Sequence, residues 1–153
     1  MPPEVLFYHL ERASLTQALP GLLAKTLERG WRATVRCGDA AAVASLDEAL
    51  WTFDEESFLP HGAGGDAAAA AREPIWLTAD ETASTDADVL FAVANARVSP
   101  EDVARHARTV VMFDGADDAA VGAARALWKE LRGAAVAATY WRQDGEGRWA
   151  KRG

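Results

Sequence analysis

The residues of this sequence that could do chemistry are three histidines, one cysteine and several pairs of carboxylates. The histidines, His9, His61 and His106, are far apart and show no paired metal-ligand spacing on a helix. No serine or cysteine lies in a nucleophile motif such as G-x-S-x-G. Asp80 and Glu81 could act as acid and base, but carboxylate pairs in polar segments usually remain solvated. The sequence therefore predicts no catalytic residue, no metal site and no cofactor.

A nucleotide site would require glycines directly after a strand, where backbone amides at a helix N-terminus meet phosphate. The first apolar run is followed by LERASLTQ, which contains no glycine. The GAGG run at 62–65 precedes no Lys-Ser or Lys-Thr pair, so a phosphate loop is also missing. These glycines instead predict a surface loop, or with the following alanines a short helix, over 62–71.

Aromatic and acidic side chains are interleaved in SLDEALWTFDEESFLPHG at 45–62, which contains Trp51, Phe53 and Phe58. On a helix, Trp51 lies about 100° from the apolar stripe formed by the leucines before it. An aromatic ring beside the core stripe and surrounded by charge is typical of the centre of a protein interface. The alternative is that the turn folds back and buries all three rings, and the pattern leaves both interpretations open.

A second unusual flank lies on the helix expected at 117–133. Its core stripe consists of Ala120, Ala124, Leu127 and Leu131, and its flank of Val121, Arg125, Trp128, Lys129 and Arg132. Two cations at (i, i+4) beside an indole suit a ligand that is both anionic and apolar, such as an acidic peptide with a hydrophobic end and a free carboxylate. The alternative is a solvated basic flank with Trp128 half buried.

Charge is distributed unevenly along the chain. The net charge is −7, which disfavours general binding to nucleic acid because the phosphate backbone recruits proteins mainly through Lys and Arg. Residues 125–153 contain seven basic and three acidic groups, a balance of +4, so the first 124 residues carry −11. This asymmetry predicts that the C-terminal part receives an acidic partner.

Apolar runs alternate with amphipathic stretches along the whole chain. Strands are expected at 4–10, 32–37, 74–78, 88–94, 108–114 and 135–141, and helices at 14–30, 39–51, 100–107 and 117–133. Pro20 falls inside the first helix, where we expect a kink or a late start. Strands and helices in turn predict a single-domain α/β three-layer sandwich with a mostly parallel sheet, Rossmann-like without a nucleotide-binding glycine loop.

The length of 153 residues suits one domain over 1–153, of which 142–153 is expected to be a flexible basic tail. No apolar run approaches the roughly 20 residues that span a bilayer. The N-terminus lacks a basic leader before its apolar stretch, so a cytoplasmic location is expected. Cys37 is alone, which excludes an intramolecular disulfide, and it is expected to be a small buried side chain at a strand end.

The motif LDEALWTFDEESFLPHG resembles, almost position for position, the segment that marks the chi subunit of bacterial DNA polymerase III. VLFYHL near the start, VVMFD, and the helix that contains Arg125 fit the same family, so the resemblance covers roughly residues 4–142. It implies an α/β fold like that of nucleotide-binding domains. It also implies a non-enzymatic accessory role in the clamp-loader assembly, near the nucleoid. The implied partners are the acidic C-terminal tail of single-stranded DNA-binding protein and the small psi subunit.

Carried over by position, the resemblance places Arg125, Trp128 and Lys129 in the tail-binding pocket. The family's further basic residue one turn earlier is here Val121, and Arg132 or Arg108 could compensate for the missing charge. The resemblance also implies that Trp51 and Phe58, with Phe53 between them, contact psi or a helicase that competes for the same surface.

Two other function classes remain open at this stage. A small Rossmann-like enzyme that binds a nucleotide or another small molecule could have a site built from scattered residues, and nucleotides would then stabilise it thermally. A direct binder of single-stranded DNA could use Trp and Arg for stacking, although the net charge disfavours it.

Overall fold

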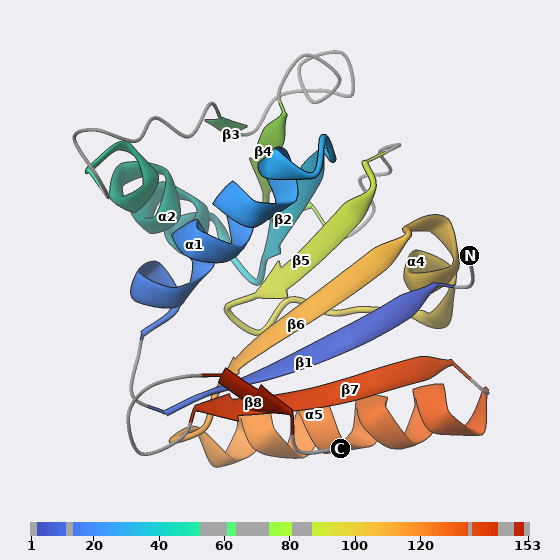
Figure 1. Ribbon diagram of the computed structural model, residues 1–153. Coiled ribbons are helices and arrows are strands. Elements are labelled where there is room, and N and C mark those ends of the chain that lie inside the picture. The colour runs from blue at the N-terminus through green and yellow to red at the C-terminus, as the bar shows by residue number, and fades with distance from the viewer. Residues whose placement is uncertain are drawn as a thin grey trace.

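The computed structural model describes residues 3–11, 14–52, 61–63, 74–80, 87–134, 136–143 and 149–151. In this part of the chain the strands form one sheet in the order β3-β4-β2-β5-β6-β1-β7-β8 (Figure 1). The strands are β1 (Glu4–Leu10), β2 (Ala33–Cys37), β3 (Gly62–Ala63), β4 (Ile75–Thr78), β5 (Val89–Val93), β6 (Arg108–Asp114), β7 (Ala137–Gln143) and β8 (Trp149–Lys151). All neighbouring pairs are parallel except β7 and β8, which confirms the predicted mostly parallel sheet.

Helices cover both faces of this sheet, as a three-layer sandwich requires (Figure 1). The described helices are α1 (Leu15–Glu28), α2 (Ala40–Thr52), α4 (Pro100–Arg105) and α5 (Asp118–Gly133). α1 and α2 pack on one face and α4 and α5 on the other. The predicted fold class is therefore confirmed, and each predicted strand and helix appears with bounds shifted by a few residues.

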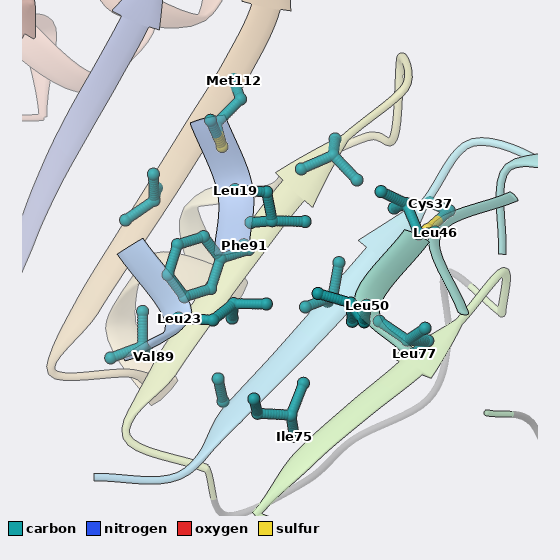
Figure 2. Close-up of a cluster of buried hydrophobic side chains, with 14 of the residues drawn as sticks. Leu19, Leu23, Cys37, Leu46, Leu50, Ile75, Leu77, Val89, Phe91 and Met112 are labelled. Carbon is teal, nitrogen blue, oxygen red and sulfur yellow. The ribbon is translucent and has the colours of Figure 1, made fainter. Parts of the chain in front are cut away.

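Two core clusters result from the alternation of side chains along the strands. Tyr8 and Leu10 of β1 point into the first cluster, under α1 and α2, where Leu19, Leu23, Leu46 and Leu50 meet Phe91 and Met112 (Figure 2). Val5 and Phe7 point into the second cluster, under α4 and α5. Because β1 is buried on both faces, its sequence is a nearly continuous apolar run rather than an alternating one.

Three details differ from the sequence-based expectations. Residues 62–63, predicted to be loop or helix, form β3 beside β4. Residues 142–143 extend β7, and 149–151 pair with it as β8, so part of the expected flexible tail belongs to the sheet. Pro20 lies inside α1, but the helix begins at Leu15, where the amide of Ser14 donates to the Gln17 side chain at 2.8 Å. Of the two alternatives predicted for Pro20, a kink or a late start, the late start does not occur.

A buried ion pair fixes α4 to the sheet. Arg36 of β2 is 3% exposed and donates two hydrogen bonds to the carboxylate of Asp102, at 2.9 and 3.2 Å. The same carboxylate accepts the backbone amide of Ser99 at 2.9 Å and so caps the helix. Burial alone would raise the pKa of Asp102, but the hydrogen bonds from Arg36 and Ser99 and the Arg36 charge outweigh it and lower the pKa to about 2.

Asp102→Asn should therefore destabilise the fold by about 3–5 kcal/mol at pH 7, because it leaves the Arg36 charge buried without a counter-charge. Urea unfolding measures this loss. Because the folded-state pKa is lowered, the stability that Asp102 contributes is present above its ordinary pKa. It is lost as the pH falls from about 4 towards 2. Asp117→Asn, at the half-buried cap of α5, is the matched control and should change stability little, since Asn caps equally well. Equal losses in the two variants would contradict the structural role given to Asp102.

Candidate partner-binding surface

The helix α5 buries the stripe that the sequence predicts. Ala120, Ala124 and Leu131 are buried in the second core cluster, and Leu127 packs against it. Asp117 caps the helix by accepting the backbone amides of Ala119 and Ala120 at 3.0 and 3.3 Å. The small alanines let α5 lie close to the sheet, and this contact fixes which flank of the helix turns outward.

That flank, called here the α5 surface, consists of Val121, Arg125, Trp128, Lys129 and Arg132. Arg125, Lys129 and Arg132 are exposed, whereas Trp128 is half-buried. The guanidinium of Arg132 lies 5.5 Å from the centre of the Trp128 ring, within cation–π range. Val121 is partly buried and packs against the second core cluster, so it presents no charge. The structure thus brings the predicted residues together on one flank, with the indole as its apolar member.

The Trp128 ring is held from below by two aromatic side chains. Phe7 of β1 meets it edge-on at 5.4 Å between ring centres, and Tyr140 of β7 does so at 6.2 Å. Edge-to-face pairs at such distances contribute beyond area burial and fix the ring orientation. Trp128 is therefore a half-buried aromatic group supported by Phe7 and Tyr140 and flanked by the Arg132 guanidinium.

Towards the carboxyl ends of the strands, this aromatic row continues into a polar cluster that the sequence analysis missed. His9 packs against Phe113 at 5.1 Å, and its Nδ1 is hydrogen bonded to the Tyr140 hydroxyl. The other ring nitrogen of His9 lies 3.3 Å from the carboxylate of Glu11, which also pairs with the exposed Arg142. This polar cluster of His9, Glu11, Tyr140 and Arg142 joins β1 and the residue after it to β7, and its two hydrogen bonds each connect residues 131 positions apart.

The charges around this polar cluster shift two pKa values. Burial lowers the pKa of His9 below its ordinary value, and the positive charges of Arg142 and Arg125 lower it further, against Glu11 and Asp114, which raise it. Burial raises the pKa of the Tyr140 phenol, while Arg142 and Arg125 act in the opposite direction. Both groups are therefore neutral at pH 7. The fields of Arg125 and Arg142 reach the same two side chains.

Arg108 does not belong to this surface, although the sequence analysis considered it as a compensating cation. Its side chain donates to Glu4 at 2.7 Å and lies 5.3 Å from the Trp31 ring. It lines a groove with Leu22 and Lys25 of α1, on the opposite face of the sheet from α5. Alternation along β6 places it there, since Val110 faces the same first core cluster.

The second predicted surface is described only in part. Leu46 and Leu50 of α2 are buried in the first core cluster, and Val43 packs against it, as the stripe predicts. Trp51 lies in the last turn of α2. Its side chain, and all of Phe53 and Phe58, lie outside the described residues.

The other chemical candidates do not form a metal site in the described part of the chain. No group of three or more His, Cys, Asp or Glu residues there could hold a metal ion. Cys37 is 1% exposed at the end of β2, as expected, and burial raises the pKa of its thiol to about 12. A crevice at the carboxyl ends of β1 and β6, where Rossmann-like folds bind phosphates, is lined by Glu11, Asp114 and Asp117. Three carboxylates there would repel a nucleotide.

The described residues thus define an α/β sandwich with a surface of exposed cations around a supported indole. Among the described helices, none combines the length and hydropathy needed to cross a bilayer. The family model of the DNA polymerase III chi subunit, HolC, matches residues 2–139, so the chain belongs to the chi family of DNA polymerase III subunits. This match confirms the resemblance seen in the sequence. The chi family is an accessory subunit of the polymerase that is not catalytic by itself.

A curated relative supports the same family. The chain is 26% identical over 98 residues to a protein of Rickettsia prowazekii (strain Madrid E) named probable DNA polymerase III subunit chi. The match covers 64% of this chain and 56% of the relative, so it spans little more than half of that protein.

Glycine positions near the polar cluster provide a test of its packing. A Cβ added at Gly115 would overlap the ring of His9 and come within 3.0 Å of the Leu10 carbonyl oxygen. Gly115→Ala should therefore destabilise the fold by about 1–3 kcal/mol, because the buried ring must move. It should also raise the pKa of His9 towards its ordinary value, which NMR titration of the imidazole measures.

Gly122→Ala is the matched control, because a Cβ at this helix position meets nothing within 4 Å. It should stabilise the protein by about 0.5–1 kcal/mol, the usual difference between Gly and Ala in a helix. A Gly115→Ala protein with unchanged stability and an unchanged His9 titration would show that the ring does not pack as described.

Proposed function

We propose that this chain is an adaptor in the DNA polymerase III clamp-loader assembly during DNA replication, in the cytoplasm at the replisome. In this proposal the α5 surface binds the acidic C-terminal tail of single-stranded DNA-binding protein. That tail ends in an apolar residue with a free carboxylate. A second surface around Trp51, Phe53 and Phe58 binds a psi-type subunit or a competing helicase.

The observation that supports the tail site most directly is the immobilised indole of Trp128 among exposed cations. Phe7 and Tyr140 hold the ring in place, so an apolar end group would find a preformed partner and lose little conformational freedom on binding. Arg125 lies one turn before Trp128, where its guanidinium is available for the terminal carboxylate. The apolar end group of such a tail thus corresponds to Trp128, and its terminal carboxylate corresponds to the neighbouring Arg125.

Electrostatics supports the same mechanism. The first 124 residues carry −11 and repel DNA, whereas the last 29 residues carry +4. The acidic tail belongs to a protein that coats single-stranded DNA. The tail would therefore be attracted towards α5 and away from α1 and α2. Such attraction weakens with salt, because the Debye length is about 8 Å at physiological ionic strength.

Arg125→Ala should weaken binding of the tail peptide of the cognate single-strand-binding protein by about tenfold or more, a loss of about 1.4 kcal/mol. Titration of the labelled peptide into wild type and variant measures this change, and added salt should weaken the wild type. Lys25→Ala, an exposed cation on α1 across the sheet, is the control and should bind like wild type. Absence of wild-type binding, with thermal stabilisation by nucleotides instead, would favour the small-molecule enzyme.

The psi-type surface has its own test. Trp51→Ala combined with Phe58→Ala should abolish co-elution with a psi-type subunit in size-exclusion chromatography, because aromatic anchors carry much of the energy of an interface. The same variant should bind the tail peptide like wild type, since α2 and α5 pack on opposite faces of the sheet. Loss of both partners together would argue against two separate surfaces.

A further inference from the structure

The α5 surface has fewer cations than the family resemblance implies. Position 121, one turn before Arg125, is a valine packed against the second core cluster. Lys129 and Arg132 follow Arg125 on the helix, and Arg132 already stacks on Trp128. A multiply charged acidic ligand would thus meet one cation on the amino-terminal side of the indole, unless another element supplies a second.

Strand β7 carries a cation two residues from Tyr140, the residue that contacts this indole. Tyr140 and Arg142 are two residues apart on β7, so their side chains leave the same face of the sheet. Tyr140 contacts Trp128 on that face, and the strand register places Arg142 opposite His9 of β1. Arg142 is exposed, as a residue that receives a ligand must be.

Arg142 and Arg125 also act on common neighbours. The electrostatic influence of both reaches His9 and Tyr140, whose side chains are hydrogen bonded to each other. Both guanidinium groups are therefore near this hydrogen-bonded pair, Arg142 on β7 and Arg125 on α5. Two cations around one aromatic row suit a peptide with more than one carboxylate.

In the described structure Arg142 is already paired, with Glu11. Glu11 follows β1 and lies 3.3 Å from His9, so a second neighbour holds it in place. Its carboxylate is the same chemical group that an acidic peptide offers. An incoming peptide carboxylate would therefore compete with Glu11 for the Arg142 guanidinium.

We propose that Arg142 is the second cation of the α5 surface and binds an acidic peptide together with Arg125, after the peptide displaces Glu11 from it. Arg142 thus replaces the charge that is missing at Val121, and Glu11 is an internal competitor that weakens binding. This inference rests on the proposed function, because it concerns how the same tail is bound.

The test is titration of the same labelled tail peptide into Arg142→Gln and Glu11→Gln at low and physiological salt. Arg142→Gln should weaken binding by about fivefold, the effect of losing one exposed ion pair, and should reduce the salt dependence. Glu11→Gln should strengthen binding by about threefold, because the competing carboxylate is gone. In the Arg142→Gln background, Glu11→Gln should have little effect, since the two residues act through one contact.

Lys25→Gln and Glu28→Gln are the matched controls. They change the net charge by the same amounts as the test variants, but at two exposed residues of α1 rather than beside β7. If Arg142→Gln binds the peptide with the same affinity as Lys25→Gln, while Arg125→Ala still binds it more weakly, this inference is overturned. The proposed function then remains intact. Glu11→Gln binding like Glu28→Gln would overturn the competition. A wild type that does not bind the peptide at all would reject the proposed function itself.

Discussion

The burial of one stripe of α5 against β1 and β7 is the constraint on which the candidate surface depends. Ala120, Ala124 and Leu131 are buried together, and the small size of the two alanines brings the helix close to the sheet. Successive residues turn by about 100° around a helix, so burying this stripe also sets the direction of Trp128. The indole then rests on Phe7 and Tyr140 because those two residues are neighbours in the parallel register of β1 and β7. The aromatic contact of Trp128 and the exposure of the neighbouring cations both follow from the burial of this one stripe.

Much of this could be predicted from the sequence, and the limits have physical causes. Continuous apolar runs predicted the buried parallel strands, and the 3.6-residue period predicted the buried stripe of α5. β3 and β8 were missed because pieces of two and three residues carry no period of their own. The polar cluster was missed because Glu11 and Arg142 meet only through the strand register, over 131 positions of sequence. The one local indication of this cluster was the spacing of Tyr140 and Arg142, since residues two apart on a strand lie on the same face of the sheet.

Net charge and local charge give different information about this molecule. The value of −7 describes the whole chain and disfavours nucleic acid, but it conceals the basic flank of α5. The acidic and basic parts of the sequence meet at the ends of β1 and β7, where Glu11 and Arg142 are paired. Arg36 and Asp102 show the other use of charge, since their pair is buried and connects α4 to β2. An exposed pair can exchange partners, whereas a buried pair must persist for the fold to remain stable.

The position of β1 between β6 and β7 also governs how the chain can fold during synthesis. β1 is made first, yet its partners begin at Arg108 and Ala137, so its pairing requires contacts between distant parts of the sequence. Folds dominated by such contacts form slowly, because the entropy cost of closing long loops comes before the favourable strand contacts form. Until β6 and β7 have left the ribosome, the edges of β1 lack their native neighbours, and unpaired apolar strands associate readily with other chains. We therefore expect the nascent chain to depend on chaperone protection until β6 and β7 have emerged.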